Sequence, residues 1–466
     1  MQFDSLTFAA FFAIVLALYA LLRGNGPKKN LLLAGSYLFY MAWSPPFVLL
    51  LMATTWLDWY VARRIAASSV QSTRNSWLVA SLVSNLGVLG YFKYGGFLLD
   101  NTQTLLAGVG IAWQPPGWDI VLPVGISFYT FQSMSYTIDV WRGRMRADWS
   151  LRDFALFVTF FPQLVAGPIV RASQFLPQLQ RERFIRADWL ARGLTLLVFG
   201  ICAKVVFADG LLAPIADRGF TPAAGTLDTW LGLFAFSGQI FFDFSAYSTC
   251  AIGAAMCLGY TLPANFRSPY AAGGFSDFWR RWHVSLSRWL RDYLYIALGG
   301  NRSGNWKTWR NLFLTMLLGG LWHGAAWGFV IWGALHGLYL VIERLTLKIS
   351  AHAARFWQSL AGQAATFLLV TFAWLFFRAP TWDGFTGALL RMAGDLPSQA
   401  TGTDINTVLI VMGGLFAWHV ATRDTGPMHR FLRLPNAARM LLVALSIFLV
   451  IIFSKGESRA FIYFQF

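Results

Sequence analysis

The chain has 466 residues, of which 56% are hydrophobic and only 12% are charged. Soluble domains carry about 25% charged residues, so this composition indicates a polytopic membrane protein and excludes a soluble globular enzyme. The formal net charge of +16 does not indicate nucleic-acid binding. Its Lys and Arg residues lie mostly in short clusters between apolar segments, which is the positive-inside pattern of membrane proteins.

At about 20 residues per crossing, the length predicts ten or eleven transmembrane helices in one membrane domain over residues 1–466. The first span is expected at residues 6–22, and the Arg and Lys residues after it predict an extracytoplasmic N-terminus. Further membrane segments are expected at residues 31–43, 47–61, 77–94, 121–138, 194–213, 231–262, 367–377, 408–421 and 440–452. The three cysteines lie in apolar segments without metal-ligand spacing, so neither a disulfide framework nor a zinc site is expected.

Residues 154–170 are apolar but include Pro162, Gly167 and Pro168, and Arg residues flank both ends. Positive charge on both sides argues against a simple crossing. The pattern predicts a re-entrant or broken element, which membranes tolerate only when it is buried in protein or lines a cavity.

The most basic part of the chain, residues 265–310, contains a helical period over Phe275–Tyr293. At about 100° per residue, one arc is apolar and aromatic, with Trp279 and Trp282, and the other is polar, with Arg280 and His283. The pattern predicts one basic amphipathic helix at the membrane interface. It either anchors the protein to anionic lipid or lines the cytoplasmic mouth of a cavity.

Residues 311–344 form an apolar stretch that contains His323 and His336. An imidazole at membrane depth is costly, so it is a functional candidate. Trp322 precedes His323, and small residues lie on both sides, which allow helix backbones or a substrate to approach closely. The alternative is a histidine that only packs between helices, and the residue types alone leave both interpretations open.

Several chemistries are absent from the sequence. It has no GxxxxGK[ST] loop for ATP-driven transport, no HExxH and no GxSxG. His323 and His336 are not spaced i, i+4 and have no neighbouring carboxylate before Glu343, so no metal site is expected. The remaining chemistry is that of an imidazole in a tunnel, with a histidine as the general base for acyl transfer to a hydroxyl.

Six runs of sequence together resemble one known family. They are LLLAGSYLFYMAW (31–43), LPVGISFYTFQSMSYTIDVWRG (122–143), FFPQLVAGPIVR (160–171), FDFSAYS (242–248), NFRSPYAAGGFSDFWRRWHVSLSRWLRDYLYIALGGNR (265–302) and GGLWHGAAWGFVIWGALHG (319–337). The combination resembles the membrane-bound O-acyltransferase (MBOAT) family, in the branch of alginate O-acetyltransferase membrane subunits. The resemblance covers residues 30–340 in the family's order, and the remaining C-terminal part resembles the family only in hydropathy.

This resemblance implies a ring of transmembrane, re-entrant and interfacial helices around a central tunnel, which joins a cytoplasmic donor mouth to an extracytoplasmic acceptor side. The histidine of WHGAAW resembles the family's catalytic histidine and falls on His323, and the histidine of RRWHVSLS falls on His283. Arg280 and Asp243 resemble further polar positions of the family. We expect them to line the donor site together with the aromatic side chains of Trp279, Trp282 and Trp322. For His336, packing and chemistry both remain open.

The resemblance further implies acetyl transfer from a cytoplasmic thioester, acetyl-coenzyme A or an acyl carrier, with no permanently bound cofactor. The expected location is the bacterial cytoplasmic membrane. The expected partners are membrane lipid, a polysaccharide acceptor (alginate first, cellulose or peptidoglycan next) and a separate extracytoplasmic O-acetyltransferase, but no nucleic acid. The competing hypothesis is a non-enzymatic transporter or flippase of a lipid-linked or polymeric glycan.

Overall fold

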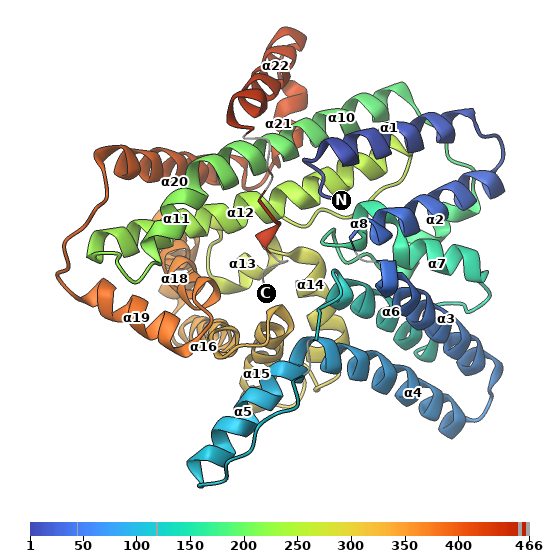
Figure 1. Cartoon of the computed structure of the whole chain (residues 1–466), viewed down its shortest axis with the longest axis horizontal. Coiled ribbons are helices and arrows are strands. Elements are labelled where there is room, and N and C mark those ends of the chain that lie inside the picture. Colours follow the sequence, from blue (N-terminus) through green and yellow to red (C-terminus); the bar gives the residue numbers. More distant parts are fainter. Residues whose placement is uncertain (44, 118–119, 455–458, 463–466) are drawn as a thin grey trace. The chain divides into compact units, whose positions relative to one another are not determined.

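The fold is helical throughout the part of the chain that the structure, a computed structural model, describes: residues 1–43, 45–117, 120–454 and 459–462. No β-strand occurs within these ranges (Figure 1). The chain packs as two compact units, Met1–Gly193 with Ala251–Leu262, and Leu194–Cys250 with Pro263–Phe466.

The helices that begin in the first unit are α1 (Leu6–Leu21), α2 (Asn25–Met41), α3 (Pro45–Ala67), α4 (Gln71–Leu89), η1 (Gly90–Tyr94), α5 (Gly95–Gly108), α6 (Ile126–Trp141), α7 (Leu151–Thr159), α8 (Phe161–Leu164), α9 (Ala172–Phe175), η2 (Leu176–Gln180) and α10 (Ala187–Cys202). The broken element predicted at residues 154–170 is confirmed. Helix α7 ends at Thr159, α8 adds one turn, and every residue from Phe154 to Val170 is buried. Irregular backbone at this position is therefore surrounded by protein, as the apolar environment requires.

A buried carboxylate joins three helices of the first unit. Asp58 of α3 is fully buried and accepts hydrogen bonds from Ser81 Oγ at 2.6 Å, from Asn85 Nδ2 at 2.9 and 3.0 Å, and from Ser133 Oγ. Ser81 and Asn85 belong to α4, whereas Ser133 belongs to α6. The three helices are thus tied at one point by charge-assisted hydrogen bonds, which are about twice as strong as neutral ones.

Replacing Asp58 by Ala is expected to lower the thermal midpoint of the purified protein by roughly 5 °C or more. Each buried donor that loses its acceptor costs roughly 1–3 kcal/mol, and Asp58→Ala leaves three side chains in that state. The control is Asp100→Ala on α5, where the side chain is exposed. Equal midpoints for the two variants would show that the buried carboxylate does not stabilise the helices.

The remaining helices are η3 (Ala203–Leu212), α11 (Ala213–Gly219), α12 (Thr226–Cys257), η4 (Pro269–Ala271), α13 (Phe275–Arg281), α14 (Val284–Trp289), η5 (Leu290–Tyr295), α15 (Asn305–His323), α16 (Trp327–Ile349), α17 (Ala351–Gln358), α18 (Leu360–Arg378), α19 (Trp382–Ala393), α20 (Gly402–Thr422), α21 (Pro427–Arg433) and α22 (Asn436–Phe453). Helices α15 and α16 lie side by side and make the most extensive helix–helix contact of the described chain.

Glycines make the close contact between α15 and α16 possible. A Cβ atom on Gly320 would lie 2.3 Å from the carbonyl oxygen of Phe329 and 2.9 Å from the Cα atom of Gly333. A Cβ atom on Gly333 would in turn lie 2.5 Å from the carbonyl oxygen of Met316. Small residues at such crossings let membrane helices approach closely, and here they fix the end of α15 against α16.

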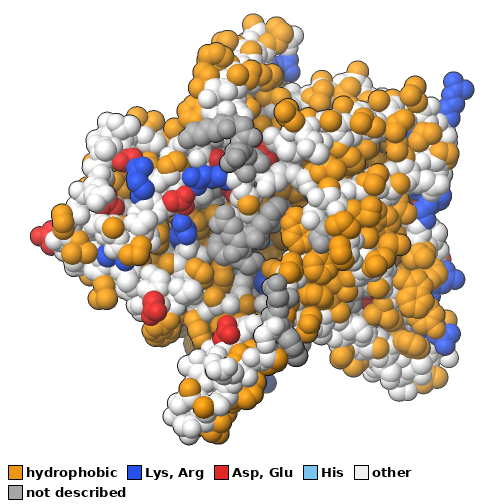
Figure 2. Space-filling view, viewed as in Figure 1, with side chains coloured by type: hydrophobic (Ala, Val, Ile, Leu, Met, Phe, Trp, Pro, Cys, Tyr) orange, Lys and Arg blue, Asp and Glu red, His pale blue; other side chains and the backbone are white. Residues whose placement is uncertain are grey.

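Six described helices are long and apolar enough to cross a membrane. They are Ala187–Gly219 (α10, η3 and α11), Thr226–Cys257, Trp327–Ile349, Leu360–Arg378, Gly402–Thr422 and Asn436–Phe453, and Leu6–Leu21 is a shorter apolar helix. Apolar side chains cover much of the surface visible in Figure 2. These features confirm the predicted polytopic all-α membrane protein. The count is below the predicted ten or eleven, because polar residues lower the hydropathy of other long helices such as α3, α4 and α15.

The continuous amphipathic helix predicted for Phe275–Tyr293 is wrong. The chain breaks after Arg281, and α13 and α14 are separate helices. The break follows from hydrogen bonds to Asn265: its carbonyl accepts the N–H of Val284 at 2.9 Å, and its side-chain oxygen accepts the N–H of Ser285 at 3.2 Å. These bonds replace the intrahelical ones that a continuous helix would need.

Candidate functional site

His323 is the last residue of α15 and is only 3% exposed. The helix ends there because Gly324 is extended, with φ at −165°, and the chain runs through a short link into α16 at Trp327. The imidazole lies among aromatic rings. Its centroid is 5.0 Å from that of Trp332 and 5.3 Å from that of Phe377.

His283 lies at the break between α13 and α14 and is fully buried. Its φ of +41° is in the left-handed region, which costs a non-glycine residue about 1 kcal/mol or more. The surrounding hydrogen bonds to Asn265 hold this conformation, and such strain concentrates at functional sites. Burial lowers the pKa of His283, which lies outside the membrane-spanning helices, to about 3, so its imidazole is neutral near pH 7.

The two histidines converge, although 40 positions separate them in sequence. Their ring centroids are 6.3 Å apart. Trp322 contacts both imidazoles, with centroid distances of 5.0 Å to His323 and 5.8 Å to His283. On the other side, the ring of Phe244 lies 4.7 Å from His283, edge to face. The site is therefore a pair of buried imidazoles inside an aromatic enclosure.

The other two predicted tryptophans lie in the aromatic core next to this pair. Trp282 is fully buried, and its ring centroid is 5.0 Å from that of Trp374. Trp279 is 9% exposed and contacts Trp332 at 5.8 Å between centroids. Because Trp332 also contacts His323, Trp279 supports the enclosure indirectly.

His336 is one ring further from the pair. It is fully buried, and its centroid is 4.6 Å from that of Trp332 and 5.1 Å from that of Trp279. Neither of its ring nitrogens has a hydrogen-bond partner within the described part of the chain. Trp332 separates it from His323, so it does not join the pair.

Asp243 lies on α12 and is 2% exposed. One carboxylate oxygen is 3.0 Å from Lys204 Nζ, and the other accepts the N–H of Ile462 at 2.8 Å. Lys204 also pairs with Asp209 at 3.0 Å. Lys204 and Asp209 lie on η3, a π-helix, in which residues five apart stack along one face, whereas an α-helix would separate them by about 140°.

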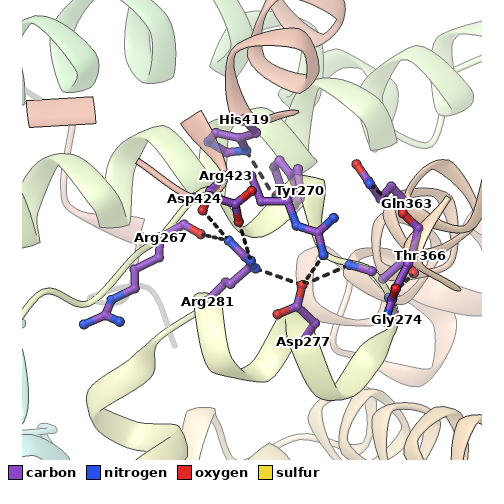
Figure 3. A network of polar contacts seen from close by, with 12 residues as sticks. Arg267, Tyr270, Gly274, Asp277, Arg281, Gln363, Thr366, His419, Arg423 and Asp424 are labelled. Carbon is purple, nitrogen blue, oxygen red and sulfur yellow. Dashed lines mark hydrogen bonds and ion pairs between the residues drawn. The ribbon is translucent and has the colours of Figure 1, made fainter. Parts of the chain in front are cut away.

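Arg280 is exposed and lines a cavity of about 620 Å³. Arg267, Arg281, Arg423 and His429 also line it, together with Asp277 and Asp424. Figure 3 shows Arg281 and Arg423 converging on Asp277, at 2.9 and 3.1 Å, while the Arg267 side chain extends away from them. Within the described residues, no close ion pair joins Arg267 or Arg280 to a carboxylate, although the charge of Arg280 also acts on Glu343. Because four arginines and two aspartates line the cavity, it carries a positive excess.

The structure thus places the predicted residues in three groups. These are the imidazole pair with Trp322 and the adjacent Trp279 and Trp282, the buried ion cluster of Asp243, and the basic cavity of Arg280. Sequence reasoning missed Lys204 as the partner of Asp243 and Arg423 as part of the basic cavity. A cation and a carboxylate in apolar segments signal an intramembrane pair. Arg423 lies far from residues 265–302 in the sequence, so nothing there indicated that it joins the basic cavity.

The sequence profile of the membrane-bound O-acyltransferase family matches residues 128–379, just over half of the chain. The chain belongs to this family. It is 46% identical over 374 residues to the probable alginate O-acetylase AlgI of Pseudomonas aeruginosa, covering 79% of this chain and 70% of that protein. It is likewise 46% identical over 361 residues to the probable alginate O-acetylase AlgI of Azotobacter vinelandii, with 76% and 70% covered.

A more distant relative is the peptidoglycan O-acetyltransferase of Helicobacter pylori, with 36% identity over 402 residues, covering 79% of this chain and 74% of that protein. These relatives and the family profile identify the MBOAT chain as an O-acyltransferase of the alginate O-acetyltransferase branch. The six matching runs therefore indicated the right family.

Proposed function

We propose that this O-acyltransferase moves an acetyl group from a cytoplasmic thioester to a hydroxyl on the extracytoplasmic side, for O-acetylation of an exopolysaccharide. The main support for the proposal is that His323 and His283 lie close together in one aromatic enclosure. The names of the relatives favour alginate as the polymer, with peptidoglycan as the next choice. The proposed location is the bacterial cytoplasmic membrane with the N-terminus outside, and the proposed partner is a separate extracytoplasmic O-acetyltransferase.

In this mechanism His323 acts as the general base. It removes the proton of the acceptor hydroxyl while the hydroxyl oxygen attacks the thioester carbonyl carbon. The carbon–sulfur bond then breaks, and the imidazolium returns its proton to the thiolate, which leaves as a free thiol. The neutral imidazole of His283 supplies an N–H donor toward the carbonyl oxygen, where negative charge develops.

The basic cavity is the proposed donor mouth. Coenzyme A and the phosphopantetheine arm of a carrier protein both carry phosphate groups, which guanidinium groups bind with charge-assisted hydrogen bonds. Arg267 and Arg280 are available for this contact, because Asp277 engages Arg281 and Arg423 instead. Phe266 lines the same cavity, and its ring lies 5.1 Å from that of Phe244, next to His283.

Replacing Arg280 by Gln is expected to weaken binding of acetyl-coenzyme A about tenfold, the equivalent of roughly 1.4 kcal/mol for a lost charge-assisted contact. The loss should be largest at low salt, since ions screen exposed charges. Binding of radiolabelled acetyl-coenzyme A to the purified protein measures it. Arg302→Gln, an exposed arginine outside the cavity, is the control; equal affinities for both variants would remove Arg280 from the donor mouth.

Expression in an alginate-producing host that lacks its own relative of this chain tests the proposed function. We expect acetyl esters to return to the secreted alginate while the amount of polymer stays the same. A glycan transporter or flippase would instead change the amount of secreted polymer and leave its acetyl content at zero. The second result would overturn the proposed function in favour of transport.

A further inference from the structure

Segment 459–462 begins at the exposed Arg459 and ends in two buried residues beside the imidazole pair. Phe461 and Ile462 are 2% and 3% exposed. The ring centroid of Phe461 is 4.8 Å from that of Tyr247 and 5.8 Å from that of Phe244, which in turn contacts His283 at 4.7 Å. The segment therefore packs against the aromatic ring that contacts one of the two histidines.

Polar contacts with other described residues hold both ends of this segment. The N–H of Ile462 donates to Asp243 at 2.8 Å, and Arg459 pairs with Asp217 at 2.6 Å. The contact to Asp243 is buried, whereas Arg459 and Asp217 are each nearly half exposed. Because solvent weakens exposed ion pairs, the buried contact is the stronger of the two.

The carboxylate of Asp243 is itself held in place. Lys204 Nζ lies 3.0 Å from Asp243 and 3.0 Å from Asp209, so one cation compensates two carboxylates. A charged carboxylate inside an apolar helix bundle is costly without such a partner. The π-helix η3 brings Lys204 and Asp209 to one face, and this arrangement leaves one oxygen of Asp243 directed at the main chain of Ile462.

The same residues border a cavity of about 220 Å³. Its lining includes Asp209, Asp217, Asp243, Arg378, Arg459 and Ile462. Arg378 and Arg459 both pair with Asp217, so the formal charges of the lining are compensated by ion pairs. Segment 459–462 thus stands between a polar cavity on one side and the ring of Phe244 on the other.

We propose that Asp243 is a positioning residue that seats segment 459–462 as a wall of the acetyl-transfer site, between the imidazole pair and the polar cavity. This inference rests on the proposed function. The wall keeps bulk water away from the bound thioester and leaves the acceptor hydroxyl as the nucleophile. Without it, water attacks the same carbonyl carbon, the carbon–sulfur bond breaks, and the products are acetate and the free thiol.

Asp243→Leu removes the acceptor of the Ile462 N–H, and we expect two opposite effects from it. Acetylation of alginate in the complemented host should fall tenfold or more, while hydrolysis of acetyl-coenzyme A by the purified protein should rise severalfold. Asp243→Asn keeps an oxygen that can accept this N–H, so it should recover part of the transfer. A merely structural role would lower transfer and hydrolysis together, and that result, or no change in either, would overturn the proposal.

A second measurement follows the segment itself. In the double variant Tyr247→Cys, Phe461→Cys, a short thiol cross-linker should join the two introduced thiols quickly. Adding Asp243→Leu to this variant should slow the cross-linking at least tenfold. Equal cross-linking rates would show that Asp243 does not seat the segment. The control is Asp228→Leu in the first turn of the same helix, which removes another hydrogen-bonded carboxylate away from this segment.

The two proposals fail in distinguishable ways. If His323→Gln leaves alginate acetylation intact, the proposed function fails whatever Asp243 does. If His323→Gln abolishes acetylation but Asp243→Leu leaves both transfer and hydrolysis at the level of the unmodified protein, the proposed function stands. Only the proposal that Asp243 seats segment 459–462 is then overturned.

Discussion

His323→Gln should lower acetylation of secreted alginate by roughly 10²–10⁴-fold, the contribution that a positioned histidine makes to acid–base catalysis. Gln fills a similar space and forms hydrogen bonds, but it does not take up the proton of the acceptor hydroxyl. Since the imidazole is 3% exposed among Trp322, Trp332 and Phe377, a substitution that keeps its volume should preserve the packing. The acetyl content of the polymer in the complemented host measures the loss.

His352→Gln is the matched control for this prediction. His352 lies on α17 with its side chain exposed. The two variants should reach the membrane in equal amounts, and only His323→Gln should lose acetylation. Acetyl content at the level of the unmodified protein in both variants would remove His323 from the mechanism.

Gly320→Leu should abolish both stable folding of the α15–α16 pair and acetyl transfer. Even the first carbon of a side chain would lie 2.3 Å from the carbonyl oxygen of Phe329, so the two helices must separate. Forcing extra carbons into a well-packed contact costs about 1–3 kcal/mol or more. Because His323 lies one turn after Gly320, the separation also displaces the imidazole from His283. Gly320→Ala should show the same effects to a smaller degree.

Gly413→Leu on α20 provides the comparison, because no atom lies within 4 Å of a Cβ added there. Thermal unfolding and polymer acetylation should both stay close to those of the unmodified protein. If Gly320→Leu matched it in both measurements, close approach of α15 and α16 would not be what positions His323.

The sequence predicted the apolar helices and named His323 and His283 as candidates, but it did not predict the backbone that brings these two histidines together. The apolar arc predicted over residues 275–293 was correct, since Trp279 and Trp282 are both buried. The same periodicity is expected whether these residues form one continuous helix or two helices with a break between them. The break depends on Asn265, a residue outside the period, whose carbonyl and side chain capture two main-chain N–H groups. Such tertiary hydrogen bonds override a local helical pattern.

In the functional site, too, some features could be predicted from the sequence and others could not. Pro162, Gly167 and Pro168 forecast a broken element because they disrupt helices by their own chemistry. The ion pair between Lys204 and Asp209 could not be predicted from the sequence, because residues five apart lie about 140° from each other on an α-helix. Their contact at 3.0 Å needs a π-helix, and nothing in the residue types of this segment signals that backbone.

The π-helical backbone of η3 also bears on how the next helix, α11, is turned about its axis. Deleting one residue between Lys204 and Asp209 would leave them four apart, a spacing at which an α-helix still allows their ion pair. Four α-helical steps and five π-helical steps both bring these two residues to one face. Every later residue of α11 would therefore keep nearly its present position about the helix axis, and Asp217 would still meet Arg378 and Arg459, which it binds at 3.0 and 2.6 Å. The π-helical backbone of η3 thus accommodates one extra residue while it keeps α11 turned toward these two arginines.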